Sequence, residues 1–193
     1  MRSFLFYFNW GWDHIISRQA LDHQLFLVAL MAIYVIQDWK RILILVSAFT
    51  IGHSLTLALS VLDWIRVNPD WVEFGIPATI VLTAVFNLQH LNPTQGQRIR
   101  QYFLAVGFGL IHGMGFANNI RFALASDENL AVNLLGFNLG LEIGQLLVVL
   151  GLMGLSMLFV GRFRVARRDW ALFLSAAAFA LALKITLERI PSL

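Results

Sequence analysis

The sequence predicts an all-α polytopic membrane protein, and three observations support this prediction. Hydrophobic residues make up 59% of the 193 residues and charged residues only 13%, whereas soluble domains contain about 45–50% apolar and about 25% charged residues. Several apolar runs reach the roughly 20 residues that a helix needs to cross a bilayer. The basic residues gather in short segments between these runs, so the net charge of +3 does not indicate nucleic-acid binding.

The first 20 residues differ from the later apolar runs because aromatic side chains dominate them. Such side chains favour the membrane–water interface. We therefore predict an interfacial or re-entrant amphipathic segment over residues 1–20, followed by one domain of about six transmembrane helices over residues 21–193. The expected spans are 22–37, 41–62, 71–90, 100–124, 130–160 and 169–187.

The distribution of basic residues predicts the orientation of these spans. Lys40 and Arg41 follow the first span, Arg98 and Arg100 follow the third, and an arginine-rich segment at 162–168 follows the fifth. Six spans bring these three segments to one side, which the positive-inside rule makes cytoplasmic. Both termini are then expected on the outer, periplasmic side. The chain has no cysteine, which excludes disulfides and thiolate metal sites.

Polar residues within the predicted spans fall at one depth. His53 and His112 each lie about 12 residues from the cytoplasmic end of their spans, or roughly 18 Å at the helical rise. Further polar residues of the outer half come from other spans: Asp22, His23, Glu73, Asn138 and Glu142. Ionisable groups at membrane depth are costly and by default mark a functional site.

Imidazole nitrogen together with carboxylate oxygen is a ligand set for a divalent transition metal such as zinc, nickel, iron or manganese. The candidate ligands are Asp22, His23, His53, Glu73, His112 and Glu142. Residues expected to orient these ligands are Ser54, Asn138, Gln145 and His14. Two acids have a simpler structural alternative. Asp22 can cap the N-terminus of the first span, and the helix dipole favours an acid such as Glu73 near the start of a helix.

Glycines predict how two of the spans pack. Gly136, Gly140 and Gly144 repeat every four residues in the fifth span, and small residues at this spacing let helix backbones approach closely. We expect this face to dock on the glycines around His112 and to bring Glu142 towards that imidazole.

Several of these segments resemble the HupE/UreJ family of bacterial membrane proteins. The similar segments are AFTIGHSLTLAL (48–59), GFGLIHGMGFA (107–117), FNLGLEIGQ (137–145), LDHQLFLVAL (21–30) and VEFGIPATIVLTAVFNL (72–88). The resemblance implies a bacterial inner-membrane location and nickel handling or permease activity. The family's polar positions carry over to Asp22, His23, His53, Glu73, His112, Asn138 and Glu142. The chain departs from the family pattern after His14, which lacks a following glycine and stands further from the Asp-His pair.

The leading functional hypothesis is nickel-type metal binding and transport at a site in the outer half of the bilayer. The cytoplasmic half offers only Asn87 and His90 to continue a path, which is the weak point of this hypothesis. The alternative is an intramembrane metal-dependent hydrolase that acts on a membrane peptide or lipid, with Glu142 or Glu73 as general base. A purely structural subunit ranks third. Expected partners are the lipid bilayer, the metal ion, and a second copy or an accessory membrane protein.

Overall fold

The computed structural model of the protein describes residues 2–91, 95–124 and 129–191, which form helices and turns but no strand. The predicted all-α class is therefore confirmed. The elements in chain order are α1 Arg2–Ile16, η1 Arg18–Ala20, α2 Leu21–Met31, η2 Ile36–Asp38, α3 Trp39–Val61, α4 Pro69–Gln89, α5 Gln95–Leu124, α6 Leu130–Ser156, the π-helical η3 Met157–Arg162 and α7 Arg167–Glu188.

Four helical segments of the described chain are long and apolar enough to cross a membrane: Ile36–Val61, Pro69–Gln89, Leu130–Arg162 and Arg167–Glu188. Helix α5 has the length, at 30 residues, but its glycines and polar residues make it less apolar. Large apolar side chains lie exposed on the outside of the bundle, among them Ile51, Leu82 and Leu150, as expected for a lipid-facing surface. The structure thus supports a membrane protein, while the number of six spans stays a prediction.

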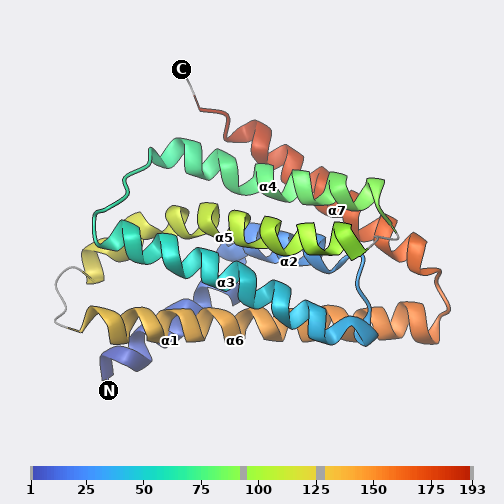
Figure 1. Ribbon diagram of the computed structural model, residues 1–193, viewed down its shortest axis with the longest axis horizontal. Coiled ribbons are helices and arrows are strands. Elements are labelled where there is room, and N and C mark those ends of the chain that lie inside the picture. Colours follow the sequence, from blue (N-terminus) through green and yellow to red (C-terminus); the bar gives the residue numbers. More distant parts are fainter. Residues whose placement is uncertain (1, 92–94, 125–128, 192–193) are drawn as a thin grey trace.

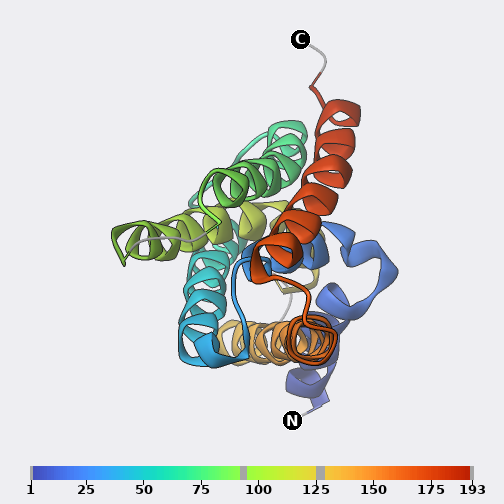
Figure 2. The ribbon, with the colours of Figure 1, turned by 90° about the vertical axis from the view of Figure 1, so that its right-hand side faces the viewer.

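The expected first span, 22–37, contains α2 and the turn that follows it. Helix α2 has 11 residues, about 16 Å at the helical rise, which is too short to cross a bilayer. Its side chains are apolar on almost every side, and seven of them are buried, as is typical of a helix enclosed by others. Helix α2 therefore lies in the middle of the bundle (Figure 2).

Helices α1 and α2 together form one broken helix. Helix α1 runs parallel to the first half of α6, since Phe4 contacts Gly136 and Ile15 contacts Gly144. The chain turns at residues 17–20, and α2 then continues towards the opposite end of the bundle (Figure 1). The assignment of residues 1–20 to the membrane interface stays a prediction, because these contacts do not locate the bilayer surface.

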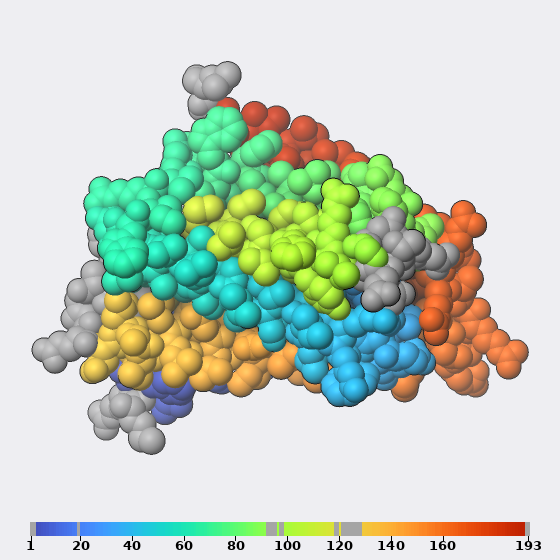
Figure 3. Space-filling model, in the orientation of Figure 1, coloured from blue at the N-terminus to red at the C-terminus, as the bar shows by residue number. Residues whose placement is uncertain are grey.

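The long helices alternate in direction. Helices α3, α5 and α7 begin at the right-hand end in Figure 1, whereas α4 and α6 begin at the left-hand end. The basic segments in the first turns of α3 and α5, together with the segment that leads into α7, therefore share the right-hand end, which we call the basic end. The opposite end holds the start of α4 and the end of α7, and we call it the pocket end. In the space-filling view, α3 lies between α5 and α6 and forms one packed face with them (Figure 3).

Glycines bring two pairs of helices into backbone contact, and the pairs differ from those expected. A Cβ on Gly109 would lie 2.2 Å from the carbonyl oxygen of Phe49, and a Cβ on Gly140 would lie 2.0 Å from that of Phe8. The glycines of α5 thus pack on α3, and those of α6 pack on α1. The expectation that the α6 glycines dock on α5 was wrong, because α1 supplies the matching surface with Phe4, Phe8 and Gly11.

We expect a Gly140→Ala substitution to lower the midpoint of thermal unfolding of the purified protein in detergent. The added methyl group would overlap the Phe8 carbonyl oxygen and force α1 away from α6, and overpacking of this kind costs about 1–3 kcal/mol. The matched control is Gly151→Ala on the same helix, where an added Cβ has no atom within 4 Å. Equal unfolding midpoints for the two variants would contradict the backbone contact.

Candidate metal centre

Four histidines from four helices meet where the broken helix turns. His14 lies near the end of α1, His23 in the first turn of α2, His53 in α3 and His112 in α5. The ring centroids of His14 and His23 are 4.5 Å apart, and those of His23 and His112 are 5.0 Å apart. The His53 ring is 6.0 Å from each of the His14 and His23 rings. We call these four residues the histidine cluster.

The turn between α1 and α2 is stabilised by one side chain. The amide nitrogen of Gln24 donates hydrogen bonds to the carbonyl oxygens of Ile15 and Ser17, at 3.0 and 3.1 Å. The Ile15 carbonyl belongs to the last turn of α1, where helical partners are missing, and the Ser17 carbonyl follows directly after the helix. Gln24 therefore satisfies the broken backbone and fixes His14 and His23 next to each other.

The ring nitrogens of the cluster lack hydrogen-bond partners. His53 and His112 are fully buried, and His23 is 7% exposed. No partner is found among the described residues for His14 Nε2, His23 Nε2, both nitrogens of His53, and His112 Nδ1. A buried polar atom left without a partner costs about 1–3 kcal/mol. So many of them in one place indicate a ligand that accepts lone pairs.

The hydrogen bonds of Thr79 determine which nitrogen of His112 carries the proton. The Thr79 hydroxyl donates its single proton to the Ile76 carbonyl oxygen at 2.7 Å. It can then only accept from His112 Nε2, which lies 3.2 Å away. A neutral His112 therefore keeps its proton on Nε2 and offers the lone pair of Nδ1. This is the form that a metal ligand requires.

The spacing of the nitrogens is close to that of a metal site. One ring nitrogen each from His14, His23 and His53 lies within 4.8 Å of the other two. Nitrogens that bind a tetrahedral ion at about 2.0–2.1 Å are about 3.3 Å apart. Small rotations of the rings would close this difference. The residues present therefore fit a divalent transition metal such as nickel or zinc, both of which imidazole suits.

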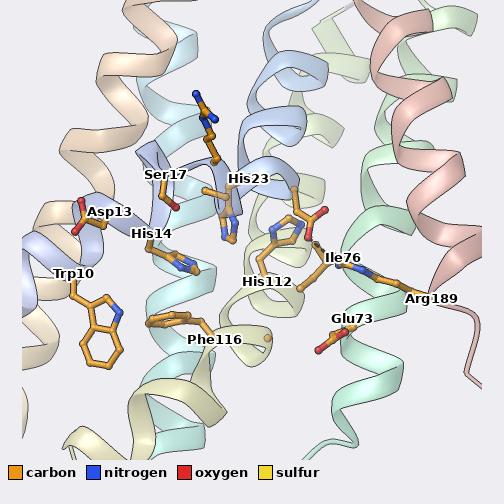
Figure 4. Close-up of a pocket in the computed structure, with 14 residues that line it drawn as sticks. Trp10, Asp13, His14, Ser17, His23, Glu73, Ile76, His112, Phe116 and Arg189 are labelled. Carbon is orange, nitrogen blue, oxygen red and sulfur yellow. Dashed lines mark hydrogen bonds and ion pairs between the residues drawn. The ribbon is translucent and has the colours of Figure 1, made fainter.

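A polar pocket of about 770 Å³ leads to the cluster from the pocket end. The rings of His14, His23 and His112 face this space, and Arg189 reaches into it from the end of α7 (Figure 4). Three carboxylates line the pocket: Asp13, Asp22 and Glu73. Asp22 accepts a hydrogen bond from Arg189 at 2.9 Å, and Arg18 lines the pocket as well, so two positive charges offset part of this acidic lining. His53 lies behind the rings that line the pocket.

Comparison with protein families assigns the chain. The sequence profile of the HupE / UreJ protein family matches residues 1–188, which is nearly the whole chain. The protein belongs to the HupE/UreJ family. No curated protein and no solved structure matches the chain. The resemblance inferred from five sequence segments is thereby confirmed.

The structure brings together only part of the ligand set predicted for this HupE/UreJ protein. His23, His53 and His112 belong to the cluster, while Asp22 and Glu73 line the pocket beside it. Glu142 does not line the pocket and accepts a hydrogen bond from Ser47 at 2.9 Å. The predicted glycine docking would have turned Glu142 towards His112, and α1 occupies that face of α6 instead.

The four residues expected to orient ligands have different places. His14 is a member of the cluster itself. Gln145 accepts a hydrogen bond from the Thr50 hydroxyl at 2.9 Å and so joins α6 to α3. Ser54 is half-buried and does not line the pocket, and Asn138 has a buried carbonyl oxygen without a partner. The structure therefore does not place Gln145 or Ser54 against the histidine rings.

Sequence reasoning missed Thr79 and underestimated His14. A signal for His14 was present, since Phe4, Phe8 and Trp12 repeat every four residues in register with Gly136, Gly140 and Gly144. That match predicts the contact of α1 with α6, and the contact carries His14 into the bundle. No comparable signal distinguishes Thr79 from the other threonines of the chain.

We expect Glu142→Gln to leave the metal content of the purified protein unchanged. Glutamine still accepts the hydrogen bond of Ser47, and the carboxylate lies outside the pocket. Elemental analysis of the variant beside the unaltered protein measures this. Loss of bound metal in the glutamine variant would show that Glu142 is a ligand after all.

Proposed function

We propose that this HupE/UreJ protein binds a divalent transition-metal ion, nickel or zinc first, at the histidine cluster and carries it across the bacterial inner membrane. The observation that carries the proposal is the group of buried ring nitrogens without partners. Manganese is a weaker candidate, since a site made of imidazoles alone lacks the carboxylate oxygens that it prefers, whereas imidazole also suits iron.

The pocket supports the transport part of the proposal. Its three carboxylates, Asp13, Asp22 and Glu73, outnumber the two arginines of the lining, Arg18 and Arg189, and a cleft with an excess of negative charge raises the local concentration of cations. An arriving ion exchanges bound waters for imidazole nitrogens, beginning with the rings that face the pocket. The site lies at the interruption of a broken helix, where transporters commonly place their substrates.

The uncharged ligand set also suits release. Neutral imidazoles bind a divalent ion without neutralising its charge. The charge that remains favours hydration of the ion, and this lowers the free-energy cost of its release into water. We assign the pocket end to the periplasmic side, because the opposite end holds the basic segments (Figure 1). Both termini then face the periplasm.

A metal-dependent hydrolase remains the second candidate because the pocket is larger than an ion requires. About 770 Å³ is room for a small organic group beside the cluster. Glu73 lines this space and could serve as general base, whereas Glu142 lies outside it. Hydrolysis of a membrane peptide or lipid that depends on added metal and on Glu73 would favour this candidate over transport.

We expect His53→Ala to lower the affinity for nickel and zinc by about 100-fold or more, because even residues that only orient ligands cost about 10–100-fold. Equilibrium titration of metal into purified protein, with elemental analysis, measures this loss. His90→Ala is the matched control, since His90 contacts the Phe86 carbonyl oxygen at 3.0 Å and does not line the pocket. Equal affinities of the two variants would refute the histidine cluster as the site.

A further inference from the structure

Helix α4 carries a line of polar side chains from the histidine cluster towards the basic end. Thr79, Thr83 and Asn87 are spaced by four residues, so they lie on one face of the helix. All three side chains are buried inside the bundle. Thr79 contacts His112, and Asn87 stands two residues before the end of α4. The line covers about 12 Å at the helical rise.

A second cavity lies along this line, between α2, α4 and α5. Its polar lining consists of Thr83, Asn87 and Gln101, and Leu30, Phe86 and Phe108 add apolar walls. The cavity measures about 10 Å³, which is close to the space of one water molecule. It is therefore closed to a hydrated ion, in contrast to the wide pocket on the other side of the cluster.

Two oxygens of this line, those of Thr83 and Asn87, make no hydrogen bond to another helix among the described residues. The Thr83 hydroxyl donates to the Thr79 carbonyl oxygen of its own helix at 2.8 Å. The Asn87 side-chain oxygen is buried without a partner among the described residues, while its nitrogen donates to the Ala29 carbonyl oxygen at 2.6 Å. If Thr83 served packing alone, an apolar side chain of similar size could replace it without loss of nickel transport.

We propose that Thr83, Asn87 and Gln101 form the closed second half of the ion path, through which the metal passes between the histidine cluster and the basic end. This inference rests on the proposed transport function. Opening requires α2 to separate from α4, which breaks the bond from Asn87 to Ala29. The Gln101 side-chain oxygen accepts a hydrogen bond from the Tyr34 hydroxyl, and this bond must open as well. The side-chain oxygens of Thr83, Asn87 and Gln101 then replace waters of the passing ion.

The test compares binding with transport in the intact protein. Thr83→Val and Asn87→Leu remove oxygens from the path, and neither residue touches the cluster. Thr186→Val is the matched control, because the buried Thr186 hydroxyl also bonds to its own helix, at Ala182, and lines neither cavity. Nickel binding is measured by equilibrium titration, and nickel uptake is measured in proteoliposomes.

We expect both path variants to bind nickel as the unaltered protein does but to transport it about tenfold more slowly, which corresponds to about 1.4 kcal/mol in the barrier. Thr186→Val should change neither quantity. Unchanged uptake by Thr83→Val would overturn the proposal. An unaltered protein that does not bind nickel, or binds it without transporting it, would refute the proposed function and the path together, whereas normal transport by the unaltered protein with unchanged uptake by Thr83→Val refutes the path alone.

A second measurement does not depend on how well Asn87→Leu folds. The chain has no cysteine, so a single Thr83→Cys substitution can be labelled selectively. We expect a small water-soluble thiol reagent applied from the basic end to label this cysteine during nickel transport. Ala84→Cys, one residue further on and also buried, should stay unlabelled because Ala84 does not line the cavity. Equal labelling of both cysteines would contradict the path.

Discussion

The buried imidazole nitrogens of the histidine cluster impose the constraint on which the rest of the structure depends. Each nitrogen without a partner costs about 1–3 kcal/mol, and five of them lie together among the described residues. A protein of ordinary stability has only about 5–15 kcal/mol in total. Packing alone would be served better by leucine at these positions. The arrangement is therefore best explained by a ligand that uses the lone pairs.

The histidine cluster forms because close helix packing through glycines coincides with a break in the chain between α1 and α2. Glycines let α1 approach the backbone of α6, which carries His14 into the interior. The chain then breaks at residues 17–20, where Gln24 satisfies the free carbonyls of α1, and His23 follows in the next turn of helix. His14 and His23 are nine residues apart, which is about 14 Å along an unbroken helix, so the break is what brings their rings to 4.5 Å. His53 and His112 come from the other glycine-packed pair, α3 and α5.

The sequence predicted the helical membrane class, the family and three of the four clustered histidines, because hydropathy and depth are local properties of a span. It did not predict which glycine face meets which helix, since Gly136, Gly140 and Gly144 are equally compatible with any smooth partner. The wrong partner for the α6 glycines led to two errors. Glu142 was expected beside His112, and His14 was given only a minor role. Thr79 escaped notice because its importance depends on a contact with another helix.

The arrangement of the helices in pairs gives Glu142 and Gln145 a structural role in place of the predicted role in the metal site. Helices α3 and α5 form one pair in backbone contact, and α1 and α6 form another. The pairs are joined by side chains, from Ser47 to Glu142 and from Thr50 to Gln145. Each such hydrogen bond contributes only about 0.5–1.5 kcal/mol net, but breaking it without a new partner leaves buried polar atoms that cost about 1–3 kcal/mol each. His53 and His112 lie on one pair and His14 lies on the other, so the spacing of the pairs sets the spacing of the rings. Glu142 and Gln145 lie outside the histidine cluster, but they join the two helix pairs that carry its rings.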